Sequence, residues 1–452
     1  MITRTGDFTM NSQRIENIAA AEEYLNRIPR FSKVKHDMSD LRTMLRMLDA
    51  EFAEDKVVHV AGTNGKGSVC AFLTSILRSA GKTTATFTSP HLVSVRERFR
   101  FDGEMISETG FMDAFTAVHQ AEEVFAGAGM TIPTYFEYLF LMFAVMCRKH
   151  PTDNIILETG LGGRLDATNC LQKPAVCAIT SISLDHMQYL GNTVTAIAGE
   201  KAGIIKEGVP FIYDNTDAEA SAVFVRTAEE KHCRAYPVDP SMAEGLAVSG
   251  KGLRFTGMTK NAGRLSLHVP FPAAYQAVNA MIAAEAAGIL GIPKEYIEEG
   301  IRSTRWPGRM EEILPGVFLD GGHNEGGIRA FASAAAALPL PAEGGRKLLL
   351  FAVSSDKEYE KMLYLLRDIM NPDAVFLTRL KTERGLDTEI LLQVARRVFG
   401  DTAEISVNSD AADAMREVLE KKKAEDLLFC AGSLYLIGEI KSAMQPYGEE
   451  KI

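Results

Sequence analysis

The segment that most constrains the fold of this chain is residues 56–81, which reads as a strand, a glycine-rich turn and a helix in direct succession. Residues 56–61, Lys-Val-Val-His-Val-Ala, form a short apolar run rich in β-branched side chains. Three glycines follow within residues 62–67, and a helical pattern then extends over residues 68–80 and ends at Gly81. A strand that enters a helix through such a turn begins a parallel sheet with crossover helices. The segment therefore predicts an α/β fold.

Other β-rich runs alternate with helical patterns along the chain, which favours a mostly parallel sheet before a break at Arg305-Trp-Pro-Gly308 and a second, smaller α/β unit beyond it. Because single hydrophobic cores stop growing near about 250–300 residues, the 452 residues are long enough for two or three domains. We predict a P-loop ATPase domain over residues 1–304 and a smaller α/β domain over residues 305–452. The strand candidates are residues 83–88, 154–157, 175–179, 210–213, 318–320, 347–353, 374–377 and 427–431.

Several helices are expected outside this alternation. Apolar residues at helical spacing over residues 13–52 predict two amphipathic helices before the first strand, and residues 273–290 and 294–303 predict two more. Alternating apolar residues over 253–272 favour a hairpin or small sheet. The most apolar segment, residues 138–147, is far shorter than the ~20 residues that a membrane-spanning helix needs. We read it as a buried helix.

The charge balance and the cysteines argue against several classes of protein. The chain has 49 Lys and Arg against 59 Asp and Glu, a formal net charge of −10, so it lacks the basic excess of a general nucleic-acid binder. Its six cysteines form no CxxC pair, which favours neither a disulfide framework nor a zinc site. Residues 1–14 are polar, unlike a signal peptide. We expect a cytoplasmic protein without membrane or nucleic-acid partners and, without a long heptad pattern, a monomer.

The glycine-rich turn predicts an ATP-binding phosphate loop. Its glycines expose backbone N–H groups to phosphate, Lys66 can neutralise the β- and γ-phosphates, and the Ser68 hydroxyl can ligate Mg²⁺. The motif departs from GxxxxGK(S/T), because Gly67 separates Lys66 from Ser68 and position 60 is Val. A turn needed only for packing is the alternative. The predicted ATP-binding loop comprises Gly62, Thr63, Asn64, Gly65, Lys66, Gly67 and Ser68.

Motifs spread over nearly the whole chain resemble those of the folylpolyglutamate synthase and dihydrofolate synthase family, relatives of the Mur peptide ligases. The resemblance implies a three-layer ATPase domain, a smaller Rossmann-like C-terminal domain and a substrate cleft between them. The motifs are Gly62-Thr-Asn-Gly-Lys-Gly-Ser68, Thr88-Ser-Pro-His-Leu92, Tyr135-Phe-Glu-Tyr138, Glu158-Thr-Gly-Leu-Gly-Gly-Arg-Leu-Asp-Ala-Thr-Asn169, Leu184-Asp-His186, Glu200-Lys-Ala-Gly-Ile204, Gly308-Arg309 and Asp320-Gly-Gly-His-Asn324.

The chemistry implied by the resemblance is ATP-dependent ligation of L-glutamate to dihydropteroate and to tetrahydrofolate or its polyglutamates. The ATP γ-phosphoryl group activates a carboxylate as an acyl phosphate, which the glutamate amine attacks to give an amide, ADP and phosphate. Cations should dominate the reacting centre, because two anions must be held together. By resemblance, the catalytic residues are Lys66, Lys201, Arg309 and His323, and further ATP-binding residues are Asn279, Arg309 and Asp320.

A Mg²⁺ site of Ser68, Glu158 and His186 is expected. Glu158 ends a predicted strand, at the edge of a parallel sheet where α/β proteins bind ligands. Carboxylate and hydroxyl oxygens suit this ion, whereas His186 enters by resemblance and would otherwise read as a core histidine. Lys201 matches a lysine that the family carries as a carbamate, whose anionic oxygens would not repel the metal. From spacing alone, Lys201 would be a surface lysine.

The resemblance also implies a substrate site. Asp166 is expected to contact the pterin ring, and Ser89-Pro-His-Leu92 is expected to close over dihydropteroate. This loop and Arg164-Leu-Asp166 look more like members that also synthesise dihydrofolate, so we expect a bifunctional enzyme. Two alternatives stay open: an aromatic stripe such as that around Phe136 is more often core, and Ser433 suits a helix cap. The predicted substrate-binding residues are Ser89, Pro90, His91, Phe136, Glu137, Arg164, Asp166 and Ser433.

Details of the pattern leave three other functions open. Two departures from the family, Tyr275-Gln276 for His-Gln and Asp320-Gly-Gly-His for Asp-Gly-Ala-His, remove no charged group. The alternatives are polyglutamylation alone, a Mur-type ligase for a cell-wall UDP-sugar precursor, and a non-catalytic ATP-regulated interaction module. Asp166 argues against the second. Loss of the phosphate-binding and magnesium-binding residues would favour the non-catalytic module, whereas every one of these predicted residues is present.

Overall fold

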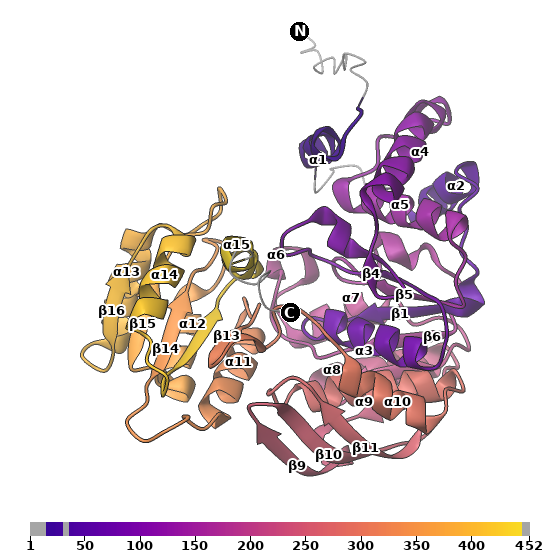
Figure 1. Cartoon of the computed structure of the whole chain (residues 1–452). Coiled ribbons are helices and arrows are strands. Elements are labelled where there is room, and N and C mark those ends of the chain that lie inside the picture. The colour runs from indigo at the N-terminus through magenta and orange to yellow at the C-terminus, as the bar shows by residue number, and fades with distance from the viewer. Residues whose placement is uncertain (1–14, 30–35, 445–452) are drawn as a thin grey trace. The chain divides into compact units, whose positions relative to one another are not determined.

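The computed structural model describes residues 15–29 and 36–444, whose helices and strands are drawn in Figure 1. The chain divides into two compact units. Unit 1 consists of Met1–Glu51 and Ile106–Lys149, and unit 2 of Phe52–Met105 and His150–Ile452. The predictions for residues 1–14, including the start of the helical pattern at residue 13, lie outside the described residues.

Unit 1 is helical in its described part, with α1 (Ile18–Arg27), α2 (Met38–Met47), α4 (Glu108–Gly127) and α5 (Tyr135–Lys149). The two amphipathic helices predicted within residues 13–52 are therefore confirmed as α1 and α2, and residues 138–147 lie in the largely buried α5. The Glu122 carboxylate accepts hydrogen bonds from the Tyr24 and Tyr138 hydroxyls at 2.7 and 3.0 Å, which satisfies a carboxylate packed among aromatic rings. No helix among residues 15–29 and 36–444 is long and apolar enough to cross a membrane.

The larger sheet of unit 2 has eight strands in the order β4-β3-β2-β5-β1-β6-β7-β8. The six strands in the spatial order β2-β5-β1-β6-β7-β8 run parallel to one another. At the edge next to β2, β3 pairs antiparallel with β2, and β4 pairs antiparallel with β3. The prediction of a mostly parallel sheet is confirmed. The strand bounds are β1 (Val57–Ala61), β2 (Thr84–Phe87), β3 (Phe99–Phe101), β4 (Glu104–Met105), β5 (Asn154–Glu158), β6 (Val176–Ile179), β7 (Phe211–Asp214) and β8 (Ala235–Val238).

Both faces of this sheet are covered, because successive side chains of its strands enter different cores. Val60 and Ala178 pack with α3 (Lys66–Ser79), α9 (Gln276–Ile289) and α10 (Lys294–Ser303). The alternate residues Ala61 and Cys177 pack with helices on the opposite face. Those helices are α7 (Val194–Ala202) and α8 (Ala218–Glu230).

A three-stranded antiparallel sheet, β11-β10-β9, contributes to the core on the α3 side. Its strands are β9 (Ala243–Ser249), β10 (Gly252–Thr259) and β11 (Gly263–Val269). The small sheet predicted over residues 253–272 is confirmed for β10 and β11. The third strand, β9, was not predicted, because its residues are mostly exposed and show no apolar alternation.

A second, six-stranded sheet follows in the order β12-β13-β17-β14-β15-β16. Apart from the antiparallel edge β12, its strands are parallel. One face packs on α11 (Glu325–Ala337), α12 (Tyr359–Leu365), the π-helical segment η5 (Leu366–Met370) and α13 (Thr388–Phe399). The other packs on α14 (Ala411–Lys421) and α15 (Leu434–Met444). The strands are β12 (Glu311–Leu314), β13 (Val317–Leu319), β14 (Lys347–Phe351), β15 (Ala374–Leu377), β16 (Glu404–Val407) and β17 (Leu427–Ala431).

We refer to residues 52–105 and 150–304 of unit 2 as the eight-stranded part, and to residues 305–444 as the six-stranded part. The expected second α/β region is therefore present. Helices α9 and α10 match the predicted helices 273–290 and 294–303 closely, and the predicted break at residues 305–308 separates α10 from β12.

Candidate active site

A cavity of about 560 Å³ lies at the carboxyl ends of the parallel strands of the eight-stranded sheet, the usual ligand side of such a sheet. The phosphate loop follows β1, Glu158 closes β5, and residues 181–186 follow β6, so three neighbouring strands aim polar groups into one space. The six-stranded part contributes Arg309 and residues 320–323 to the same cavity. The structure thus brings together residues that are more than 250 positions apart in the sequence.

The phosphate loop is held by the segment after β6. The Thr63 N–H donates to the Ser181 carbonyl at 2.8 Å, and the Thr180 hydroxyl donates to the Asn64 carbonyl at 2.6 Å. Gly65 has a φ of +93°, and a Cβ added there would lie 2.4 Å from Asn279 Oδ1. Glycine is required at this position by both backbone and space. The loop leads directly into α3, whose N-terminal N–H groups and dipole favour an anion.

Two lysines meet at the start of this loop. Lys66 Nζ donates to the Gly62 carbonyl at 3.0 Å and to the Thr63 carbonyl at 3.2 Å. Lys201, which is 4% exposed, donates to the same Gly62 carbonyl at 2.6 Å. Burial and, after it, the charge of Lys66 lower the pKa of Lys201 to about 7. A substantial fraction of Lys201 is therefore the neutral amine near pH 7.

The three residues expected to bind a metal all line the cavity. Ser68 is buried and its hydroxyl accepts a hydrogen bond from Gln276 Nε2 at 3.2 Å. Glu158 is buried and accepts from the Ser89 N–H at 3.0 Å. Burial raises the pKa of Glu158, against the opposing charge of Lys66. A buried carboxylate whose charge is disfavoured by burial and a buried hydroxyl are oxygen donors of the kind that a hard cation binds.

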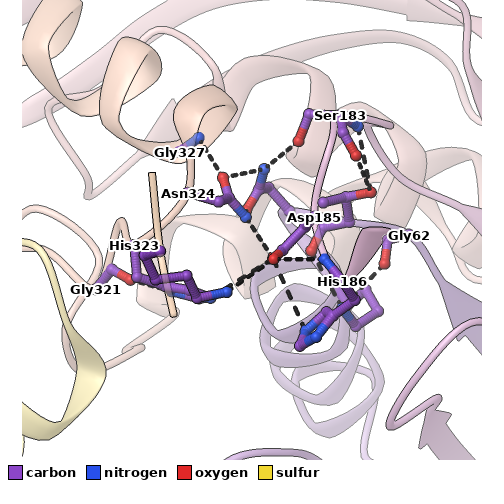
Figure 2. A network of polar contacts seen from close by, with 12 residues as sticks. Gly62, Ser183, Asp185, His186, Gly321, His323, Asn324 and Gly327 are labelled. Carbon is purple, nitrogen blue, oxygen red and sulfur yellow. Dashed lines mark hydrogen bonds and ion pairs between the residues drawn. The ribbon is translucent and has the colours of Figure 1, made fainter. Parts of the chain in front are cut away.

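Asp185 is the centre of a polar network around the third of these residues, His186 (Figure 2). Its Oδ1 accepts from Lys357 Nζ at 2.8 Å, and its Oδ2 accepts from Asn324 Nδ2 at 2.8 Å. The Nε2 atoms of His186 and His323 each lie 3.9 Å from Asp185 Oδ2. Burial opposes the charged form of Asp185, but His186, His323 and Lys357 together outweigh it and hold its pKa below the ordinary value.

Asp320 organises the loop that carries Arg309. Its Oδ2 accepts from the Tyr275 hydroxyl and from the Met310 N–H, both at 3.0 Å, and its Oδ1 accepts from the Gly322 N–H at 2.8 Å. Burial raises the pKa of Asp320, while Arg309 acts in the opposite direction. Tyr275, which departs from the family pattern, thus supplies a hydrogen-bond donor from the eight-stranded part to the carboxylate beside Arg309.

The predicted nucleotide and catalytic residues therefore gather in one place. The phosphate loop, Asn279, Lys201, Arg309, Asp320 and His323 all line the cavity. Burial lowers the pKa of His323 to about 4, and its Nδ1 lies 2.8 Å from the Gly321 carbonyl. Because a carbonyl only accepts, Nδ1 carries the proton and Nε2 is the unprotonated nitrogen of the neutral ring.

The predicted substrate residues are distributed differently. Ser89 and Pro90 line the cavity. Asp166 is buried, and its carboxylate accepts the Gly160 and Leu161 N–H groups at 2.8 Å each and both donors of Thr168. It thereby fixes residues 160–162, which do line the cavity. Its contact to a pterin stays a prediction.

Four further predicted substrate residues have protein partners in the structure. His91 Nδ1 accepts from Arg98 Nε at 3.0 Å, and the Arg164 guanidinium pairs with Glu200 at 2.8 Å. Ser433 caps α15 by accepting the Tyr435 N–H at 3.1 Å, as its structural alternative requires. Glu137 lies in unit 1, next to Phe136, where its carboxylate accepts the Thr134 N–H at 2.7 Å and lies 3.1 Å from His36 Nδ1. Burial of Glu137 is explained by these partners.

Three residues of the network were given no role by sequence reasoning: Asp185, Asn324 and Lys357. The first two stand inside recognised motifs, beside His186 and His323. Lys357 follows β14 in the polar run Ser354-Ser-Asp-Lys357, and its position after a parallel strand is the signal that could have found it.

Comparisons with known proteins agree with this arrangement. The family model of the Mur ligase middle domain matches residues 60–287, and that of the Mur ligase glutamate ligase domain matches residues 308–434. The dihydrofolate synthase/folylpolyglutamate synthase of Bacillus subtilis is 32% identical over 432 residues, which cover 91% of this chain and 96% of that protein.

Solved structures show the same fold. E. coli FolC in complex with DHPP and ADP is 28% identical, with a TM-score of 0.82 over 97% of this chain and 100% of that chain. The folylpolyglutamate synthase of Thermotoga maritima is also 28% identical, with a TM-score of 0.79 over 94% of this chain and 96% of that chain.

The two sheets, the phosphate loop and the shared cavity define an ATP-dependent ligase of the Mur type. Within that class, the chain belongs to the folylpolyglutamate synthase and dihydrofolate synthase family. The resemblance read from the sequence is confirmed.

Proposed function

We propose that this protein ligates L-glutamate both to dihydropteroate and to tetrahydrofolate or its polyglutamates, with ATP as co-substrate and an acyl phosphate as intermediate. The observation that carries the proposal is the convergence of Lys66, Lys201 and Arg309 on one cavity behind a phosphate loop. Joining two anions requires such a concentration of positive charge, because phosphate and carboxylate otherwise repel each other. The names of the B. subtilis relative and the DHPP and ADP bound to E. coli FolC support this choice of substrates.

The residues suggest a division of labour in the reaction. The phosphate loop and the start of α3 bind the ATP phosphates, with Lys66 turning from the Gly62 carbonyl to the phosphate oxygens. Arg309 neutralises charge that develops on the transferred phosphoryl group. The glutamate amine then attacks the acyl phosphate, with neutral His323 available to take its proton at Nε2. The nitrogen forms the amide bond, and phosphate leaves with the electron pair of the broken C–O bond.

A magnesium ion fits the residues that line the cavity. Ser68 and Glu158 supply hydroxyl and carboxylate oxygens, and His186 supplies an imidazole to the same cavity. When bound, the ion would neutralise phosphate charge. Lys201 supports the same arrangement as a carbamate, because its buried amine is partly neutral near pH 7 and only a neutral amine adds CO₂. Conversion to a carbamate also removes the repulsion between Lys201 and Lys66.

Several wider expectations belong to the same proposal. We place the domain boundary between residues 304 and 305, in the interval between the two matched family domains. We also propose a cytoplasmic monomer whose partners are small molecules. Dual activity is supported by the Ser89 and Pro90 wall next to Glu158, since this loop form resembles members that accept dihydropteroate.

Product formation tests the proposal directly. Purified protein would be incubated with ATP, Mg²⁺ and L-glutamate, with dihydropteroate or tetrahydrofolate as acceptor, and the products identified by mass spectrometry. We expect glutamate adducts of both acceptors and ATP hydrolysis that depends on an acceptor. Product from tetrahydrofolate alone would restrict the protein to polyglutamylation. Product from neither, or ATP hydrolysis equally fast without an acceptor, would contradict the proposed ligation.

A further inference from the structure

The phosphate loop and the first turn of α11 are joined by a reciprocal pair of amide hydrogen bonds. Asn64 Nδ2 donates to Asn324 Oδ1 at 3.2 Å, and Asn324 Nδ2 donates to Asn64 Oδ1 at 3.1 Å. Asn64 belongs to the eight-stranded part and Asn324 to the six-stranded part, 260 positions later in the sequence. In Figure 2, dashed lines join the Asn324 side chain to Gly327 and to Asp185. We call this pair the amide clasp.

The neighbours of Asn324 fix the orientation of its side chain. Oδ1 also accepts the Gly327 N–H at 2.7 Å, which caps α11, and Nδ2 also donates to Asp185 Oδ2 at 2.8 Å. A flipped amide would direct its NH₂ group at an N–H donor and its oxygen at a carboxylate. Asn324 is 5% exposed, and its side-chain oxygen and nitrogen both have protein partners, as buried polar groups require. Only one orientation of the Asn324 amide therefore satisfies all of its neighbours.

The backbone of α11 approaches the phosphate loop closely at the same point. A Cβ added to Gly326 would lie 2.7 Å from Ser183 Oγ and 3.4 Å from Asn64 Nδ2. Real Cβ atoms do not approach neighbours this closely without displacement. The absence of a side chain at Gly326 is thus a second, independent feature that brings the two parts together where Asn64 and Asn324 pair.

We propose that Asn324 is a positioning residue for ligation, which holds the six-stranded part on the phosphate loop through the amide clasp. The adjacent residue His323 and the loop of Arg309 belong to the six-stranded part, whereas Lys66 belongs to the phosphate loop. Their mutual distances depend on the contact between the parts, and errors of about 1 Å in such a site can reduce turnover by ~100-fold. The proposal rests on the ligase function proposed above.

Replacement of Asn324 by Asp separates clasping from helix capping. An aspartate keeps an oxygen for the Gly327 N–H and is as good an N-cap as asparagine. It cannot donate to Asn64 Oδ1, and its second oxygen would face the Asp185 carboxylate. The matched control is Asn17→Asp at the N-cap of α1, where Asn17 Oδ1 accepts the Ala20 N–H at 3.0 Å.

Two readouts test the clasp. We expect Asn324→Asp to lower kcat by about 10- to 100-fold while the KM for ATP changes by less than about threefold, because the loop itself is intact. The chain has one tryptophan, Trp306, in the segment joining the two parts. Its ring lies 2.8 Å from where a Cβ on Gly67 would be, so it contacts the phosphate loop. Acrylamide should therefore quench Trp306 fluorescence more strongly in the variant than in the wild type or in Asn17→Asp.

Each outcome decides the question. Unchanged kcat in Asn324→Asp, or reduced kcat with unchanged quenching, overturns the clasp. If the wild type makes no product, the proposed ligation fails, and the quenching comparison alone upholds or overturns the clasp. If Asn324→Asp does not fold, Gly326→Ala replaces it, with Gly127→Ala as control, since a Cβ on the helical Gly127 meets nothing within 4 Å. Because the new Cβ in Gly326→Ala would push α11 away from the phosphate loop, this variant should have a lower kcat and stronger quenching of Trp306 than the wild type. Wild-type values of both would overturn the proposal.

Discussion

Lys66 and Lys201 donate hydrogen bonds to the same carbonyl oxygen, that of Gly62, at 3.0 and 2.6 Å. Two ammonium groups that share one acceptor repel each other, and the pKa of about 7 for buried Lys201 reflects burial first and this repulsion second. The pair is the point at which the phosphate loop and α7 meet. It also motivates the first two predictions.

Lys201 should carry CO₂ when the protein is incubated with bicarbonate. The neutral amine fraction rises as pH increases through about 7, so the fraction modified should rise between pH 6 and pH 8. We would measure a carbamate carbonyl signal by NMR with ¹³C-labelled bicarbonate, using Lys201→Ala to assign it. Absence of a Lys201-dependent signal at pH 8 would exclude the modification.

Lys66→Ala should abolish most ligation without unfolding the protein. Loss of the charge on the phosphoryl group is expected to lower kcat/KM by about 10²- to 10³-fold, as for other groups that stabilise charge in the transition state. The matched control is Lys82→Ala, because Lys82 is exposed. Product formation and circular dichroism would be measured for both. Retention of ligation by Lys66→Ala would contradict the assigned phosphate loop.

Gly65→Ala should eliminate ATP binding, whereas Gly81→Ala should leave it intact. Both glycines have positive φ, +93° and +72°, so both substitutions strain the backbone by about 1 kcal/mol or more. Only at Gly65 does the new Cβ also meet a neighbour, Asn279 Oδ1 at 2.4 Å, while a Cβ on Gly81 meets nothing within 4 Å. Calorimetric titration with ATP separates the two. Equal ATP affinities would show that the loop tolerates the side chain.

Asp426→Asn should destabilise the six-stranded part at pH 7 but much less in acid. The buried carboxylate accepts the Arg346 backbone N–H and Arg346 Nη2, both at 2.9 Å. Burial opposes its charge, yet Arg346 and backbone donors outweigh burial and lower the pKa of Asp426. Its stabilisation is therefore present above the unfolded value of about 4 and is lost as pH falls towards the lower folded value.

The expected cost of this substitution is about 1–3 kcal/mol at pH 7, the range for a buried charged hydrogen bond. We would compare urea unfolding midpoints of the wild type and the variant at pH 7 and across the acid range. Asp401→Asn, at an exposed position, should show no such difference. A difference between wild type and Asp426→Asn that grows as pH falls would refute the direction of the pKa shift.

Local sequence was sufficient for much of the fold. The run at residues 56–61 became β1, and the break at residues 305–308 separates α10 from β12, because apolar periodicity and chain breakers act over a few residues. Among the described residues, six strands were not predicted: β3, β4, β8, β9, β12 and β16. Most of their side chains are partly or fully exposed, so their pairing partners, rather than their own apolar pattern, define them.

The site was also divided between what sequence and structure supply. Residue types and their positions in the sequence were enough to predict the phosphate loop and Glu158, and the family resemblance was enough to predict roles for Arg309, Asp320 and His323. The pairing of Asn64 with Asn324 and the contact of Lys357 with Asp185 follow from the folded structure alone. The residues of these two contacts are 172 and 260 positions apart in the sequence. Such hydrogen bonds depend on how the two sheets come together, and no local sequence pattern encodes the distance between their atoms.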